Sequence, residues 1–175
     1  MTEFKDGLPM PRRLWAMAVL MAGLALVSWD MAAANVALPD IATDLNVLPG
    51  LVVWVMIAYT VTVLVGILPS SAVAERIGFR QMYGLGSTIF MVGALACAFS
   101  TSFSMLLIAR VVQGIGSAML MSLFGGLVRN IYPMRQLGLG VSLSSLVVGV
   151  LAVLGPAIGA FIIELSSWRW TFVVY

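Results

Sequence analysis

Two charged residues, Asp30 and Arg110, lie inside apolar stretches that are long enough to cross a lipid bilayer. A carboxylate within a membrane-spanning helix costs about 2.5–3.5 kcal/mol even on a lenient insertion scale, so it persists where it faces a partner or a cavity. Burial disfavours the charged form of a carboxylate, whereas a neighbouring arginine favours it. If the two residues are neighbours, their chemistry is the uptake and release of a proton coupled to local structure.

The depth of the two charges favours a direct pair. Asp30 precedes Leu38, the predicted outer end of the first helix, by about 12 Å at the helical rise per residue. Arg110 follows Phe103, the predicted start of the fourth helix, by about 10 Å at the same rise. A direct ion pair between opposite charges at nearly the same depth costs less free energy than leaving each charge in its own water pocket. An arrangement with two separate water pockets stays open on the sequence alone.

A polar and small stripe accompanies Arg110 on its predicted helix. Gln113, Gly114 and Ser117 follow it at the i+3, i+4 and i+7 positions, which lie on one helical face. Gln113 is an acceptor that could hold the arginine when the carboxylate is protonated. We therefore expect this face of the helix to meet Asp30.

The composition excludes most soluble classes of protein. Of the 175 residues, 62% are hydrophobic and only 9% are charged, whereas soluble domains have about a quarter charged residues. The absence of histidine excludes His-ligated metal sites and Ser-His-Asp triads within this sequence. The single cysteine, Cys97, cannot form an internal disulfide, and the net charge of +2 indicates no nucleic-acid partner. The sequence therefore predicts an integral membrane protein without a cofactor or metal.

Five stretches are long and apolar enough to form membrane-spanning helices, each of which needs about 20 residues. After an N-terminal tail of residues 1–13, they cover residues 14–38, 51–74, 82–100, 103–128 and 137–163. A further apolar run, residues 170–175, predicts the start of a sixth helix. The expected fold is an all-α membrane bundle, and the chain reads as the incomplete N-terminal part of a larger protein whose remaining helices would be its partners.

The basic residues predict the orientation of this bundle. Seven of the nine lysines and arginines fall in the tail and in the segments after the second and fourth predicted helices. Because basic loops stay in the cytoplasm, we expect a multi-pass protein of the cell membrane with a cytoplasmic N-terminus. Arg12, Arg13 and the small residues 32–34 could also mimic a signal peptide, but the apolar stretch between them is long and Asp30 interrupts it.

A charged segment separates the second and third predicted helices. It contains Glu75, Arg76, Gly78 and Arg80. The glycine allows a sharp turn, and the charges could latch onto neighbouring helix ends. Such charges also serve simply as topology determinants, so both interpretations stay open.

The fifth predicted helix contains a motif for close packing. Gly155 and Gly159 are spaced as a small-xxx-small pair, which lets another helix approach closely. Pro156 removes a backbone hydrogen bond and should kink the helix between them.

In this order and spacing, the motifs resemble the major facilitator superfamily, and most narrowly the fourteen-helix (EmrB/QacA-like) branch of its drug–proton antiporters. The first and second helices are similar to the family at Asp30, Asn35–Pro39, Trp54 and Tyr59. Later matches are Arg110, Gln113, Gly114, Gly116, Gly155, Pro156, Gly159, Trp168, Arg169, Trp170 and Phe172. The sequence departs from the family pattern at Ala32, Ser71, Glu75, Phe79 and Ala160.

The resemblance implies a bundle of two six-helix domains plus two extra helices, with a central cavity that opens alternately to each side. It assigns proton coupling to Asp30 and Arg110, and a cavity or coupling role to Asn35, Tyr59 and Gln113. The residues that it assigns to conformational motifs are Glu75, Arg76, Gly78, Arg80, Gly114, Gly155, Pro156 and Gly159. The implied activity is export of a small amphipathic or cationic drug in exchange for protons, and not enzymatic catalysis.

Two other classes of function stay open on the sequence alone. A membrane scaffold or assembly subunit without transport activity would explain the short length, but not two intramembrane charges at one level. An intramembrane enzyme would need a convergent nucleophile or metal set, and the sequence has neither a histidine nor a second buried carboxylate.

Overall fold

The computed structural model describes residues 9–174, apart from the side chains at positions 125 and 130. The described residues form α-helices and short 3-10 helices and contain no strand, which confirms the all-α prediction. The elements in chain order are α1 (Met10–Asp44), α2 (Pro49–Val52), α3 (Trp54–Ile77), α4 (Phe79–Ala98), α5 (Phe103–Ile131), η1 (Met134–Gln136), α6 (Leu137–Leu165) and η2 (Trp168–Phe172). Five helical spans in this part of the chain are long and apolar enough to cross a membrane.

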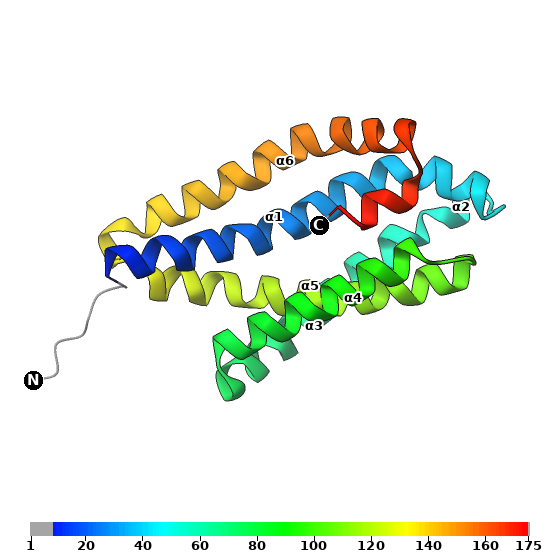
Figure 1. The fold of residues 1–175 in the computed structure, drawn as a ribbon. Coiled ribbons are helices and arrows are strands. Elements are labelled where there is room, and N and C mark those ends of the chain that lie inside the picture. The colour runs from blue at the N-terminus through cyan, green and yellow to red at the C-terminus, as the bar shows by residue number, and fades with distance from the viewer. Residues whose placement is uncertain (1–8, 175) are drawn as a thin grey trace, which may run out of the picture.

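The helices form two closely packed groups. In one group α6 lies alongside α1, and in the other α5 packs against both α3 and α4 (Figure 1). Direct packing between the groups is less extensive and involves mainly α1 with α5. The short helix η2 contacts α1, α6 and α4, so it touches both groups. Because this packing is limited, individual side-chain contacts between α1 and α5 contribute strongly to holding the two groups together.

The first helix is longer than predicted, because it runs through Pro39 and ends at Asp44. The prediction that residues 39–50 connect two helices is wrong at this point. A proline removes one backbone hydrogen bond, which spanning helices tolerate where their neighbours compensate, and the following Ile41 is fully buried. Two residues after the end of the helix, Asn46 has a positive φ of 52°, a conformation that is typical just beyond a helix C-terminus.

The connection between α3 and α4 is also shorter than the predicted segment 75–81, whereas the one between α4 and α5 is longer than predicted, because α4 ends at Ala98. Only Gly78 separates α3 from α4, and its φ of 92° is a conformation that glycine adopts readily. Helical hydrogen bonding continues beyond the apolar residues, so α3 and α5 include charged residues in their last turns. The predicted sixth helix corresponds in part to η2, and Tyr175 lies outside the described residues, as does most of the predicted tail.

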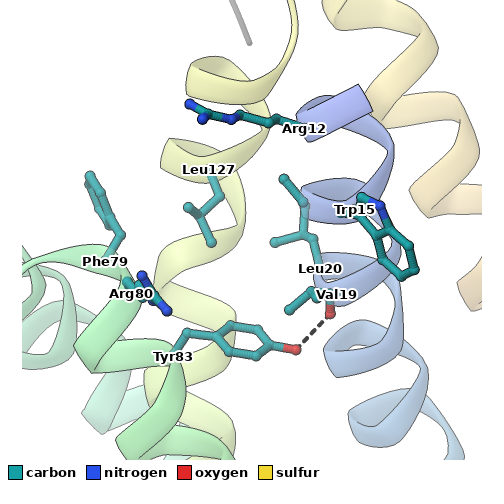
Figure 2. A pocket seen from close by; sticks show the side chains of 9 residues that line it. Arg12, Trp15, Val19, Leu20, Phe79, Arg80, Tyr83 and Leu127 are labelled. Carbon is teal, nitrogen blue, oxygen red and sulfur yellow. Dashed lines mark hydrogen bonds between the residues drawn. The ribbon is translucent and has the colours of Figure 1, made fainter. Parts of the chain in front are cut away.

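Most of the arginines gather at one end of the bundle. The start of α1, the start of α4 and the end of α5 meet there, around a hollow lined by Arg12 and Arg80 (Figure 2). Arg13 donates a hydrogen bond to Gln136 at the start of α6, with 2.8 Å between Nη1 and Oε1. Arg169 lies at the opposite end, in η2. Lys5, which the orientation prediction also uses, lies outside the described residues.

Small residues allow α6 to approach α1. A Cβ atom on Gly155 would lie 2.6 Å from the Cβ of Ala32, and one on Gly159 would lie 3.3 Å from the Cα of Ala33. Contacts below 3.0 Å require one of the two helices to shift. Both glycines are therefore packing residues, and a larger side chain is tolerated less well at Gly155 than at Gly159.

We expect Gly155→Leu to destabilise the protein by about 2 kcal/mol or more, because overpacking a close contact forces the backbone to move. Gly159→Leu should cost less, and Gly149→Leu is the matched control, since a Cβ at Gly149 meets nothing within 4 Å. Ala160→Gly should have a small effect. The midpoint of thermal unfolding in detergent measures all four variants of the whole protein, and equal losses in all of them would contradict this account.

Candidate functional site

The structure brings Asp30 and Arg110 together in the middle of the bundle. Nη1 of Arg110 lies 2.9 Å from Oδ1 and 2.8 Å from Oδ2 of Asp30. Both side chains are completely buried, with 0% of each exposed. Because Asp30 belongs to α1 and Arg110 to α5, this ion pair joins the two groups of helices.

Gln113 completes a triangle with the ion pair. Its Oε1 accepts a hydrogen bond of 2.8 Å from Nη1 of Arg110, and its Nε2 donates one of 2.9 Å to Oδ1 of Asp30. Gln113 is one turn from Arg110 on α5, as the predicted stripe requires, and it is fully buried. An amide that serves both charges in this way lowers the cost of keeping them out of water.

The guanidinium group of Arg110 also contacts α3. Nε of Arg110 donates to the carbonyl oxygen of Val55 at 3.3 Å, and Nη2 lies 3.8 Å from the sulfur of Met56. The guanidinium carbon lies 4.3 Å from the ring centroid of Tyr59 and 5.6 Å from that of Phe172 in η2. Arginine is attracted to aromatic rings at such distances, and each ring also excludes water.

The surroundings of this cluster are closed and apolar. The hydroxyl group of Tyr59 is 2.7 Å from that of Ser117, and the thiol of Cys97 donates to Oε1 of Gln113 at 3.6 Å. Cys97 and Phe172 belong to the hydrophobic cluster that packs around α1, α3, α4 and α5. Since the described residues alone enclose the ion pair, additional helices could only add to its cover in this conformation.

Other residues of the predicted site lie elsewhere. Asn35 is exposed, and its side chain donates to the carbonyl oxygen of Met31 at 2.9 Å. It lines an open hollow of about 330 Å³ between α1 and α6, together with Pro156. The structure therefore places Asn35 on a different side of α1 from the buried Asp30.

The four residues of the predicted motif around the α3–α4 turn take no part in the ion-pair cluster. Glu75, Arg76, Gly78 and Arg80 are exposed around the turn between α3 and α4. No ion pair within 4.0 Å joins these side chains to another residue of the described range. Gly114 has a packing role instead, because a Cβ there would lie 2.9 Å from the Cβ of Thr62 on α3.

A second hollow, of about 620 Å³, lies at the arginine-rich end. Figure 2 shows the side chains that line it. Arg12 and Arg80 lie at its rim, and Tyr83 crosses its floor and donates a hydrogen bond of 2.6 Å to the carbonyl oxygen of Val19. This hollow contains none of the residues of the ion-pair cluster. Among residues 9–174, no three histidine, cysteine or acidic side chains gather as metal ligands would.

Sequence reasoning missed three contributors to the cluster. The carbonyl group of Val55 carries no signal in any sequence, because every residue has one. Cys97 lies in an apolar run and carries no signal of its own. Phe172 belongs to η2, which is separated along the chain from Arg110 in α5 by η1 and α6. Only the packing of η2 against α1 and α4 reveals that Phe172 faces the arginine.

Comparison with known proteins identifies the class of this bundle. Residues 20–175 match the family model of the Major Facilitator Superfamily. The chain is 42% identical to the "Uncharacterized transporter YebQ" of Escherichia coli strain K12 over 97% of the chain and 37% of that protein. It is also 34% identical to the "Putative multidrug resistance protein MdtD" of Pectobacterium atrosepticum, over 91% of the chain and 34% of that protein.

The chain therefore belongs to the major facilitator superfamily, a class of multi-pass membrane transporters. It spans about a third of the length of these relatives. Its helices are accordingly those that match the N-terminal part of such a transporter.

Proposed function

We propose that the whole protein is a proton-coupled exporter of small amphipathic or cationic compounds that works by alternating access. The buried cluster of Asp30, Arg110 and Gln113 carries this proposal, because an uncompensated charge at this depth is costly and this pair joins two groups of helices. The name of the Pectobacterium relative refers to multidrug resistance, which supports the proposed substrate class. No enzymatic activity is part of the proposal.

Protonation of Asp30 would remove one charge and leave the other in place. Arg110 would keep the carbonyl oxygen of Val55, Oε1 of Gln113 and the ring of Tyr59 as neighbours. The cation is therefore not stranded when the carboxylate becomes neutral. Protonation weakens the electrostatic attraction between α1 and α5, and the two groups of helices can then shift relative to one another.

The hollow beside Asn35 is the proposed place where substrate meets these helices. It opens between α1 and α6, and its lining is mainly apolar with the amide of Asn35 as a polar contact. Pro156 lies in its wall and gives α6 a point at which the helix can bend. The hollow lies against α1, the helix that carries Asp30, so a cationic substrate bound there would favour release of the proton through a shift of α1.

The exposed charges at the α3–α4 turn have a proposed role outside this part of the chain. Glu75, Arg76 and Arg80 have no ion pair with another described residue and can pair with helix ends of the remaining protein. Gly78 provides the turn that presents them. In this proposal they hold one of the two alternating conformations.

Transport by the whole protein in liposomes tests the proposed function. An imposed proton gradient should drive movement of a lipophilic cationic dye such as ethidium, and addition of the dye to purified protein should release protons. A protonophore is the control, because it removes the gradient without touching the protein. Dye movement that is absent, or that is the same without a gradient, would contradict the proposal and favour a scaffold.

We expect the N-terminus to be cytoplasmic and the protein to reside in the cell membrane, because the arginine-rich end of the bundle should face the cytoplasm. The connection between α1 and α2 should then face outward. In the whole protein, a cysteine at position 48 (Leu48→Cys, a side chain that is 70% exposed) should react with an impermeant thiol reagent added outside intact cells, whereas Gln81→Cys should not. The reverse pattern would invert the proposed orientation.

A further inference from the structure

The short helix η2 lies between solvent and the buried ion pair. Trp168 and Phe172 point inward, with 3% and 1% of each side chain exposed, whereas Trp170 of the same helix is 52% exposed. The rings of Trp168 and Phe172 meet edge to face, with 6.1 Å between their centroids. The ring centroid of Phe172 in turn lies 5.6 Å from the guanidinium carbon of Arg110.

One exposed carboxylate holds this helix in place. Oδ2 of Asp44, the last residue of α1, accepts hydrogen bonds of 2.7 Å from Nη1 of Arg169 and 3.1 Å from Nε1 of Trp168. The other end of the Arg169 guanidinium donates to the carbonyl oxygen of Ser100, just after α4, at 3.2 Å. Arg169 also lies 4.4 Å from the ring of Trp168. Asp44 therefore ties η2 to α1, and Arg169 ties it to the end of α4.

An open hollow reaches this helix from outside. It has a volume of about 370 Å³ and is lined by Asp40, Asp44, Ser167 and Trp168, among others. Between this hollow and Arg110 lie the two aromatic side chains of η2, Trp168 at the hollow and Phe172 at the arginine. At this end of the described chain, a path from the hollow to the ion pair therefore leads through η2, which the contacts of Asp44 hold in place.

We propose that η2 is a movable cover over the ion pair and that Asp44 is the positioning residue that keeps the cover closed. When the contacts of Asp44 with Arg169 and Trp168 break, Phe172 withdraws and the ion pair becomes accessible from the Asp44 end of the bundle. That this cover controls proton access to Asp30 rests on the proton-coupling role proposed above. The existence of the cover does not, because it follows from the packing of η2 alone.

Cys97 provides a reporter beneath the cover. It is fully buried, it belongs to the same hydrophobic cluster as Trp168 and Phe172, and its thiol touches Gln113 of the ion-pair cluster. An impermeant anionic methanethiosulfonate can reach it only when that cluster opens. The experiment uses the whole protein in membrane vesicles, with cysteines beyond residue 175 replaced, and measures the rate of labelling from each side.

We expect Asp44→Asn to accelerate labelling of Cys97 by about fivefold or more, because it weakens a charged hydrogen bond and an ion pair that hold the closed state. The increase should appear only from the side on which Leu48→Cys reacts. Asp40→Asn is the matched control, since it removes an exposed carboxylate of the same hollow that has no ion pair with a described residue. It should label at the parental rate.

Two further variants make the result decisive. Arg169→Gln removes the same ion pair from its other end and should give the same increase as Asp44→Asn. Phe172→Ala removes the inner part of the cover and should accelerate labelling, whereas Trp170→Ala, a larger truncation on the exposed face of η2, should not.

Equal labelling of Asp44→Asn and Asp40→Asn would overturn the proposal, as would an increase from the opposite side only, or opposite results from Asp44→Asn and Arg169→Gln. Labelling needs neither substrate nor a proton gradient. A failure of the transport assay would therefore leave this test readable, and a failure of the cover would leave the transport proposal standing.

Discussion

Asp30→Asn in the whole protein is expected to reduce proton-driven efflux to the level of empty liposomes while membrane insertion and folding are retained. Asparagine has nearly the same size as aspartate and keeps a carbonyl oxygen that can accept from Arg110 and Gln113, as Oδ1 of Asp30 does. It has no proton to exchange between pH 4 and pH 9. Substrate-induced proton release from purified protein measures the effect directly.

The matched control for this variant is Asp40→Asn, which removes a carboxylate from the exposed end of the same helix. It should transport and release protons as the parent does. If Asp30→Asn still releases protons and transports at the parental rate, the ion pair is structural and the coupling mechanism is wrong.

Arg110→Ala is expected to have the largest effect on stability, a loss of about 3–5 kcal/mol. The substitution leaves Asp30 buried with Gln113 as its remaining hydrogen-bond donor of the triangle, and it opens a cavity between the rings of Tyr59 and Phe172. Arg110→Lys should lose less, because it keeps the charge, but a single ammonium group cannot reproduce the planar fork that reaches Asp30 and Val55 together. Thermal unfolding in detergent and the yield of folded protein measure both variants.

Two controls separate the buried charge from general damage. Arg169→Ala breaks an ion pair whose arginine side chain is 34% exposed, and should cost no more than about 1 kcal/mol. The double variant Asp30→Asn with Arg110→Ala should be more stable than Arg110→Ala alone, because no buried carboxylate is left without its cation. If Arg110→Ala unfolds no earlier than Arg169→Ala, the pair contributes little to the fold.

The sequence was sufficient to predict the membrane-spanning helices. A helix in lipid must satisfy its own backbone hydrogen bonds, so an apolar stretch of sufficient length has few alternatives. The ends of the helices were less predictable. Pro39 predicts the end of a helix, but it lies inside α1. The helix continues because Ile41, after the proline, packs into the core.

The pairing of Asp30 with Arg110 could also be anticipated, since few charges are tolerated within a membrane and opposite ones at one depth have a strong reason to meet. The position of Gln113 beside Arg110 followed from helical spacing, because the i+3 position lies on the same face, whereas its hydrogen bond to Asp30 was not predicted. Asn35, by contrast, was grouped with the cluster by resemblance, and the structure places it beside a separate hollow.

The sequence by itself determined which segments span the membrane and which two charges they carry, because the cost of polar groups in lipid acts on each segment separately. Only the tertiary structure decided what surrounds those charges. The carbonyl group of Val55, the thiol of Cys97 and the ring of Phe172 come from three other elements, and their positions depend on how closely the helices approach. The tie from Asp44 to η2 has the same origin: an exposed charge forms its pair with whichever partner the packing of the helices brings within reach.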